Sequence, residues 1–365
     1  MARVLLVSKP LVPPWNDSSK NLARDVAAGL ERHVPVAFGD GSRAWVPPRG
    51  ELEHLYRERG RFAPGLTAQL RVLARLALGA RADLWHFFFA PNPKSSAAGR
   101  ACAALRRTPT VQTVCSRPRD LSLARSLLFA DLTVVLSRAT LADLRDAGVP
   151  SERLAHVPPA VPPLEPLDAV QRRAARETLG LPLDAPIVLF PGDLELGDGA
   201  GRVVEAFARM RAEDALLVMA CRPKTGGAQA AERALRERMR ALGIAERAVW
   251  IGETPHIHAL IGAADVVALP STDLFAKMDL PLVLLEAMWL ARPVVVAAGG
   301  PAAELADEGG AIAADEGALS DTLGDLLDDR AARAALGERA RRAAEARYHP
   351  ARMASEYETL YDRVL

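Results

Sequence analysis

Short runs of consecutive apolar residues recur along the chain, separated by polar loops and amphipathic stretches. The stretch Ala263–Gly300 shows this pattern most clearly. It predicts a strand, a polar loop, a helix, a second strand and a glycine turn, at Asp265–Leu269, Pro270–Asp279, Pro281–Leu290, Pro293–Ala298 and Gly299–Gly300. Apolar runs that are continuous rather than alternating are typical of parallel strands buried on both faces. The pattern therefore predicts an α/β fold with parallel sheets.

The same pattern begins twice, once in each half of the chain. The first half opens with a strand at Arg3–Ser8, a helix at Lys20–Arg32 and a strand at His33–Phe38, and the pattern restarts at Ile187–Pro191. Between the halves, Pro158–Pro166 contains five prolines, which favour a stiff, extended segment. A chain of 365 residues is too long for one ordinary core. We therefore predict a doubly wound domain at residues 1–160, a proline-rich linker at 161–171, a second doubly wound domain at 172–347 and a C-terminal helix at 348–365.

An arginine-rich stretch, Glu51–Arg81, is predicted to be helical with a break at Pro64–Gly65. Its second half places leucines and a valine among Arg71 and Arg75, as an amphipathic helix does. Packing on the sheet with the arginines in water is the favoured interpretation, because surface helices commonly have this pattern. The alternative is weak peripheral contact with an anionic membrane surface.

Composition narrows the possible partners and compartment. Lys plus Arg number 46 and Asp plus Glu number 45, so no net charge indicates nucleic-acid binding. The three cysteines are scattered, which suggests neither a disulfide framework nor a zinc site and fits a reducing cytoplasm. No long uncharged apolar segment predicts a membrane span, and the short N-terminal apolar run is expected to be a strand rather than a signal peptide. We expect a cytoplasmic protein, with peripheral membrane contact as the alternative.

Ligands of parallel sheets bind beyond the carboxyl ends of the strands, where helix N-termini also point. Pro270–Leu280 and Gly299–Ala303 are therefore predicted to be ligand-facing loops. Arg222 and Lys224 directly follow a predicted strand, Ala215–Ala220, so they are expected at the same edge.

Several short motifs follow one another in the order and spacing typical of one enzyme family. They are Asp83–His86, Ala130–Asp131 with Ser137, Val157–Val161, Pro270–Ser271 with Leu284–Met288, and Pro293–Val295 with Gly299–Gly300 and Glu304. Together they resemble the glycosyltransferases of the GT-B fold, family four, over nearly the whole chain. The resemblance implies two Rossmann-like doubly wound domains facing across a cleft, with Tyr348–Leu365 crossing back onto the first domain. It also implies transfer of a sugar from a nucleotide-diphosphate-sugar donor, with retention of anomeric configuration.

This sequence departs from the family pattern at four places. The family usually has two glutamates in the stretch described first; the second is Glu286, but the first falls on Met278. The usual arginine and lysine that hold the donor diphosphate align with Asp193 and Asp198. A common histidine is replaced by Cys115, and a glycine-rich first loop by Asn16–Ser19. The resemblance is therefore to a divergent member of the family.

On the donor side, a departing diphosphate needs fixed cations or helix N-termini to neutralise its charge. Arg222 and Lys224 are the predicted replacements for the missing pair; the alternative is a chance Arg-Pro-Lys turn. Lys277 is the third candidate, unless it pairs with Asp279. The resemblance assigns Glu286 to the ribose hydroxyls, against the alternative of an ion pair with Arg292. The remaining donor-site candidates are Gly192, Gly299, Gly300 and Pro301.

On the acceptor side, the candidates lie in the loops after the strands of the first domain. They are Lys20, His86, Asn92 and Lys94, with Arg117 and Arg119 in a similar loop. A lone histidine on an apolar strand is more often a hydrogen-bonded core residue, so His86 is the weaker choice. The cations suggest a phosphorylated or carboxylated acceptor, which could be a glycan, a lipid-linked molecule or a small molecule.

We expect a metal-independent enzyme without a bound cofactor, because no Asp-x-Asp motif lies in a predicted ligand loop. Two alternatives differ in class. One is an inactive GT-B partner that binds sugar or acts as a scaffold, which would suit the missing glutamate and basic pair. The other is a GT-B sugar-nucleotide epimerase or phosphorylase, although an epimerase needs more clustered carboxylates and histidines than this sequence offers.

Overall fold

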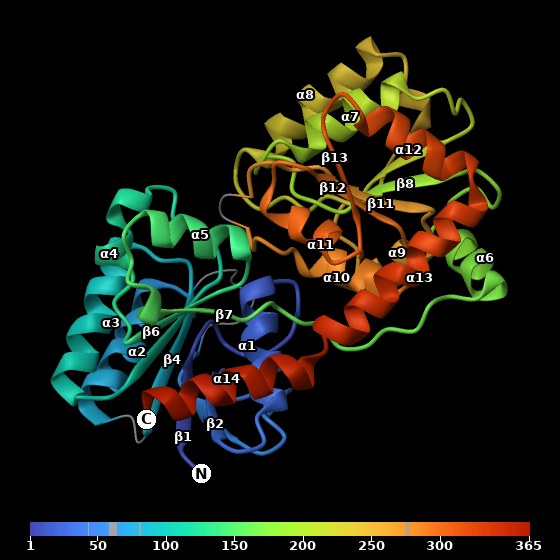
Figure 1. Cartoon of the computed structure of the whole chain (residues 1–365). Helices are drawn as coiled ribbons and strands as arrows, with labels where there is room; N and C mark the ends of the chain where they lie inside the picture. Colours follow the sequence, from blue (N-terminus) through green and yellow to red (C-terminus); the bar gives the residue numbers. More distant parts are fainter. Residues whose placement is uncertain (43, 58–63, 80–81, 275–276) are drawn as a thin grey trace. The chain divides into compact units, whose positions relative to one another are not determined.

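The computed structural model describes residues 1–42, 44–57, 64–79, 82–274 and 277–365, which form two compact units (Figure 1). The first unit contains Met1–Pro162 and Tyr348–Leu365, and it also includes residues 277–280. The second unit contains Pro163–Leu274 and Pro281–Arg347. The predicted C-terminal domain is therefore interrupted, since the segment that carries Lys277 belongs to the first unit.

A seven-stranded parallel sheet forms the centre of the first unit, in the order β3-β2-β1-β4-β5-β6-β7. Its strands are β1 (Arg3–Val7), β2 (Val34–Gly39), β3 (Glu51–His54), β4 (Leu84–Phe89), β5 (Thr110–Val114), β6 (Leu132–Val135) and β7 (Leu154–His156). Its helices are α1 (Ser18–Gly29), α2 (Leu66–Gly79), α3 (Pro93–Arg106), α4 (Ala124–Leu127), α5 (Arg138–Asp146) and α14 (Pro350–Val364). The strand order reverses between β1 and β4, and in such sheets this switch point is where ligands bind.

The second unit contains a six-stranded parallel sheet in the order β10-β9-β8-β11-β12-β13. Its strands are β8 (Ile187–Phe190), β9 (Leu216–Met219), β10 (Ala248–Trp250), β11 (Val266–Leu269), β12 (Val294–Ala297) and β13 (Ile312–Ala314). Its helices are α6 (Ala169–Thr178), α7 (Gly199–Arg209), α8 (Ala228–Ala241), α9 (Ile257–Ala263), α10 (Leu282–Trp289), α11 (Glu304–Asp307), α12 (Leu319–Asp328) and α13 (Arg330–Arg347). The two parallel sheets confirm the predicted α/β class, and the switch point of this one lies between β8 and β11.

The predicted helix over Glu51–Arg81 is wrong at its start, because Glu51–His54 forms the edge strand β3. Two glutamates of this strand pair with arginines from two other elements. Arg3 of β1 donates to Glu51 at 2.8 Å, and Arg75 of α2 donates to Glu53 at 2.8 Å. Such pairing lets a sequence with little β character form an edge strand. Residues 58–63 and 80–81 of the predicted helix lie outside the described residues.

Helix α2 packs on the first sheet through one face only. Ala68 and Leu76 are buried in the core cluster that contains Trp85, while Leu66 and Leu78 are 71% and 86% exposed. In the described part of the chain, no helix has the length and apolarity that crossing a bilayer requires.

The proline-rich connection ends three residues earlier than predicted. Residues 158–168 form neither helix nor strand, and α6 begins at Ala169. Asp168 caps this helix: its carboxylate accepts the amide of Gln171 at 2.8 Å, and the Gln171 side chain accepts the amide of Asp168 at 3.0 Å. This reciprocal capping box stabilises the helix start, so residues 169–171 belong to a helix and not to the linker.

The C-terminal helix α14 packs against α1 within the first unit. The carboxylate of Glu358 is buried and accepts backbone amides at the end of α1, including that of Glu31 at 2.8 Å. Tyr357 and Tyr361 are fully buried against the sheet. These contacts tie the last residues of the chain to the core of the first unit.

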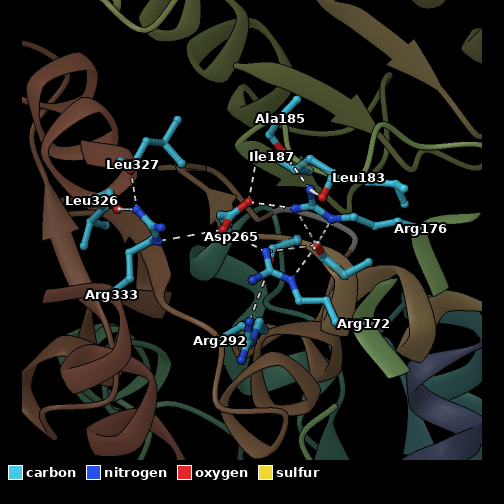
Figure 2. A network of polar contacts seen from close by, with 12 residues as sticks. Arg172, Arg176, Leu183, Ala185, Ile187, Asp265, Arg292, Leu326, Leu327 and Arg333 are labelled. Carbon is cyan, nitrogen blue, oxygen red and sulfur yellow. Dashed lines mark hydrogen bonds and ion pairs between the residues drawn. The ribbon is translucent and has the colours of Figure 1, made fainter. Parts of the chain in front are cut away.

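A buried carboxylate, Asp265, organises the amino-terminal edge of the second sheet (Figure 2). Arg172 and Arg176 of α6 donate to its two oxygens at 2.7 and 2.9 Å, and the amide of Ile187 donates to it at 2.9 Å. Arg333 of α13 lies 3.8 Å away. Asp265 therefore connects the starts of β8 and β11 to two helices that are far apart in the sequence.

The arginines around Asp265 also donate to carbonyl groups near helix ends. Arg176 donates to Ala263, Arg292 to Leu290, and Arg333 to Leu326. Burial alone would raise the pKa of Asp265, but Arg172, the amide of Ile187 and Arg176 outweigh this effect and lower it. Burial and the charge of Arg172 lower the pKa of Arg292 to about 10. The network is thus tightly packed, with more positive than negative charge.

Replacing Asp265 by Asn should destabilise the second unit by about 3–5 kcal/mol at neutral pH, because the buried guanidinium of Arg176 would lose its counter-charge. Hydrogen exchange of the β8 and β11 amides measures this free energy. Since the pKa of Asp265 is lowered in the folded state, its stabilisation is present above the unfolded pKa and is lost as pH falls through the folded value. The difference between variant and wild type should therefore shrink in acid.

The matched control is Glu165→Gln, which removes an 84% exposed carboxylate that pairs with Arg341. Its effect should stay within about 0.5 kcal/mol. Equal effects of the two substitutions would contradict the organising role of Asp265.

Candidate functional site

The carboxyl-terminal edge of the second sheet brings together the loops that follow β8, β9, β11 and β12. These are the loops in which the sequence places the donor-site candidates. The loop after β8 leads into α7, and the loop after β11 leads towards α10. Because β8 and β11 flank the switch point, this edge is the expected ligand-binding edge of the unit.

Arg222 and Lys224 lie beside the loop after β8, at the predicted edge. An isolated parallel bridge joins Asp193 to Arg222. The Asp193 carboxylate lies 3.8 Å from Nε of Arg222 and 3.7 Å from Nζ of Lys224. Glu195 accepts the backbone amides of Lys224 and Thr225 at 2.8 and 2.6 Å. The acidic residues of this loop therefore hold the basic turn in place.

Asp198 connects the loop after β8 to the loop after β11. Its carboxylate accepts the amide of Thr272 at 2.9 Å and Nε of Arg202 at 2.7 Å. Burial alone would raise the pKa of Asp198, but hydrogen bonds from Thr272 and Asp273 lower it. The loop after β11 is thus tied to the first turn of α7 by a charged residue.

The glycine turn after β12 packs against the loop after β11. A Cβ on Gly300 would lie 2.3 Å from the carbonyl oxygen of Ser271, so only glycine fits there. Gly299 is exposed with open space around it, and Pro301 starts a short 3-10 turn. Gly192 lies just beyond β8, against the ring of Phe190. All four candidate positions belong to the carboxyl edge of the second sheet.

Glu286 lies on α10, and its partner is a residue that sequence reasoning missed. Its Oε1 is 3.3 Å from Nε2 of His258 on α9. The expected alternative partner, Arg292, donates to the carbonyls of Leu290 and Ala264 instead. The hydrogen bond with Glu286 raises the pKa of His258. Nothing in the spacing of His258 and Glu286 marks them as neighbours, since the pair depends on how α9 packs on α10.

The third predicted cation, Lys277, belongs to the first unit together with Met278 and Asp279. Met278 and Asp279 are buried there. Asp279 accepts the hydroxyl of Ser137 at 2.7 Å and also the hydroxyl of Thr140, at the start of α5. Burial raises the pKa of this carboxyl group. Asp279 is therefore engaged by hydroxyl groups of α5, a contact that its sequence position does not reveal.

Lys20 and His86 were predicted to bind the acceptor, but both side chains are buried. Nζ of Lys20 donates to the carbonyl of Val12 at 2.9 Å and to that of Pro14, so it holds the loop after β1. Burial lowers its pKa. His86 is fully buried, with Nδ1 2.7 Å from the Tyr361 hydroxyl and Nε2 2.7 Å from that of Thr113. Both side chains serve the core of the first unit and are not exposed to an acceptor.

The other acceptor-side candidates are exposed. Asn92 caps α3 by accepting the amide of Ser95 at 3.0 Å, and Lys94 follows in the first turn. Arg117 and Arg119 follow β5, and Arg117 lies 3.1 Å from Asp143. Polar and cationic groups therefore line the carboxyl ends of β4 and β5. Across the residues described, no three His, Cys, Asp or Glu side chains form a group that could hold a metal ion.

Comparison with known proteins identifies the family. Residues 171–343 match the family described as Glycosyl transferases group 1. The whole chain also superimposes on Anabaena Alr3699/HepE in complex with UDP-glucose, with a TM-score of 0.78 at 19% identity over 99% of this chain and 100% of that one. Residues 171–343 belong to the group 1 glycosyltransferases, and the chain has the GT-B fold. WaaG, a glycosyltransferase involved in lipopolysaccharide biosynthesis, shares this fold with a TM-score of 0.70 at 17% identity, over 96% of this chain and 98% of that one.

Curated relatives of this chain include the D-inositol 3-phosphate glycosyltransferase of Xylanimonas cellulosilytica, 36% identical over 58% of this chain and 52% of the relative. The enzyme of the same name from Corynebacterium urealyticum is 30% identical over 76% of this chain and 66% of the relative. The chain thus spans about half to two thirds of the length of these relatives.

The buried imidazole of His86 predicts that the first unit loses stability in acid. Burial lowers the pKa of His86 well below its ordinary value, so the unfolded chain binds a proton that the folded one does not. Stability of the first unit should therefore fall as pH drops below about 6.5, by up to about 1.4 kcal/mol per pH unit. His86→Gln should remove this component, as measured by hydrogen exchange of the β4 and β5 amides between pH 7 and pH 5.

The control is His54→Gln, since His54 is exposed at the end of β3. This variant should keep the pH dependence of the wild type. An unchanged slope in His86→Gln would show that His86 is not the group responsible.

Proposed function

We propose that this glycosyltransferase moves a sugar from a nucleoside-diphosphate donor, held by the second unit, to a hydroxyl group of a small phosphorylated acceptor, held by the first unit. The reaction is proposed to retain anomeric configuration and to need no metal ion. The observation that carries the proposal is the arrangement of Arg222, Lys224 and Glu286 at the carboxyl edge of the unit that matches the group 1 transferases.

The donor side of the proposal follows from charge. When the glycosidic bond to the donor breaks, negative charge develops on the departing diphosphate, and fixed cations stabilise it. Arg222 and Lys224 share one carboxylate, Asp193, so the three groups together keep one positive charge. This arrangement would replace the basic pair that is common in the family.

Glu286 supports the nucleotide end of the same site. Its carboxylate is proposed to accept the ribose hydroxyls, as the family resemblance implies. Its side chain is 20% exposed, so it is reachable from solvent without being fully hydrated. A carboxylate in such a partly buried position binds hydroxyl groups well, because each oxygen accepts more than one hydrogen bond.

The acceptor side rests on the relatives and on the exposed cations of the first unit. The relatives are named for D-inositol 3-phosphate as acceptor. Lys94, Arg117 and Arg119 are exposed after β4 and β5, which is where a parallel sheet presents its ligands. We therefore propose a phosphorylated cyclitol, or a sugar phosphate of similar size, as the acceptor class.

Nucleotide binding tests the donor site. In a thermal-shift panel, UDP, GDP and their glucose and N-acetylglucosamine conjugates should include at least one compound that stabilises the wild type. At a ligand concentration about 100 times Kd the stabilisation is about 2.7 kcal/mol. Arg222→Ala should reduce the shift strongly, whereas Arg240→Ala, an exposed arginine of α8, should leave it unchanged. Absence of any shift, or equal shifts in both variants, would eliminate the diphosphate site.

A transfer assay tests the acceptor and the stereochemistry. With the stabilising donor, inositol 3-phosphate should be glycosylated, and unphosphorylated inositol should have a kcat/KM at least about tenfold lower, which corresponds to about 1.4 kcal/mol. Proton NMR of the product should show the configuration of the donor, and EDTA should leave the rate unchanged. Arg119→Ala should raise the KM for the phosphorylated acceptor, while Arg145→Ala, on the last turn of α5, should not.

Binding of nucleotide without any transfer would instead favour an inactive GT-B partner. Met278, which replaces the family's first glutamate, is the observation that keeps this alternative in the test.

A further inference from the structure

His258 contacts Glu286 from a different helix, and the family resemblance assigns no role to this histidine. It lies in the first turn of α9 with a side chain that is 49% exposed, and its Nε2 is 3.3 Å from Oε1 of Glu286. Both residues belong to the second unit. Glu286 is the single charged side chain of α10, so the pair is the polar contact between two otherwise apolar helix faces.

We propose that His258 is a positioning residue that holds the Glu286 carboxylate ready for the ribose hydroxyls of the donor and makes this interaction depend on pH. The inference rests on the proposed function, because it assigns a role to a neighbour of the proposed ribose-binding residue. It adds a residue and a regulation that the donor-site argument does not contain.

The ion pair with His258 gives a physical reason for the Glu286 carboxylate to be oriented before binding. A glutamate side chain has three rotatable bonds, and fixing it in a binding geometry costs conformational entropy. Protonated His258 forms an ion pair with Oε1, so part of this entropy loss has already occurred before the nucleotide binds. Oε2 and the second lone pair of Oε1 stay available as acceptors for two ribose hydroxyls.

The direction of the pH effect follows from the same contact. The Glu286 carboxylate raises the pKa of His258, so the charged pair exists below that pKa and is lost as pH rises through it. Neutral imidazole holds the carboxylate more weakly, and ribose recognition should then decline. The proposal therefore predicts tighter recognition of ribose in mildly acidic solution than in basic solution.

The groups around His258 support a simple two-residue coupling. The charged residues of α6, which packs on α9, are engaged elsewhere: Arg172 and Arg176 bind Asp265, and Arg173 pairs with Glu177. Beside its own helix, the titratable neighbours in sequence are Glu253 and His256, both exposed. The pKa of His258 is raised by Glu286 through direct contact with the carboxylate and through its negative charge.

The test compares UDP with 2′-deoxy-UDP, which differ by one ribose hydroxyl and have the same ionisable phosphates. Calorimetric Kd ratios at pH 6 and pH 8.5 therefore cancel the titration of the ligand. In the wild type, UDP should bind about tenfold more tightly than 2′-deoxy-UDP at pH 6, and this preference should fall about threefold or more by pH 8.5. A preference that does not change with pH would overturn the role of His258.

Three variants separate the possible explanations. His258→Asn keeps an uncharged donor and should retain an intermediate preference that no longer depends on pH, whereas His258→Leu should lose most of the preference. His256→Asn, a control on the same helix end, should behave as the wild type. His258→Leu with the full wild-type preference would contradict the proposal.

Glu286→Gln distinguishes this inference from the proposed function on which it rests. If Glu286 binds ribose, this variant should lose the preference at both pH values, and the imidazole pKa of His258, measured by NMR, should fall. A preserved ribose preference in Glu286→Gln, or no binding of either nucleotide, would overturn the proposed donor site and this inference with it. A lost preference combined with a pH-independent wild type would overturn the role of His258 alone.

Discussion

The amino-terminal edge of the second sheet depends on the pairing of Asp265 with arginines from distant elements. Taking a carboxylate and guanidinium groups out of water is costly, and only close pairing with satisfied hydrogen bonds offsets that cost. Arg176 meets this condition by donating to both Asp265 and several backbone carbonyls. Arg292 and Arg333 donate to carbonyls near the ends of α10 and α12, where the helix dipole favours cations. The network thus fixes helix ends and strand starts at one edge, while the loops at the opposite edge can vary.

At the carboxyl edge of the second sheet, the acidic residues near Arg222 and Lys224 are paired with cations or backbone amides. Asp193 lies between Arg222 and Lys224, and Glu195 is occupied by two backbone amides. Asp198 is bound to Arg202 and to the loop after β11. Asp193 and Glu195 therefore support the turn after β9, whereas Asp198 supports the loop after β11. Acidic residues at positions 193 and 198 are therefore compatible with a phosphate site, because the loop after β9 supplies Arg222 and Lys224 as cations.

The sequence was sufficient for the fold but only partly for the site. Strands such as Val266–Leu269 could be predicted because their apolar runs are continuous, and the matching order of short motifs pointed to the family. The edge strand at Glu51–His54 was missed because its stability comes from arginines of β1 and α2, which local pattern does not encode. Lys20 could not be recognised as buried, since its partners are carbonyls of a loop whose path the sequence does not specify. The pairing of His258 with Glu286 could not be predicted either, because it depends on how α9 packs on α10.

The segment of residues 277–280 shows why the missing glutamate has no simple substitute next to it. Asp279 is adjacent to Met278 and is the obvious candidate to replace the lost carboxylate. However, its Oδ2 accepts hydroxyl groups from Ser137 and Thr140, and burial raises its pKa, so at this position a full negative charge is disfavoured. A carboxyl group that is buried and bound within the first unit is unsuited to recognising a solvent-exposed sugar hydroxyl. Of the two family glutamates, only Glu286 therefore remains. Its carboxylate lies 3.3 Å from His258, which is the residue proposed to hold it in position.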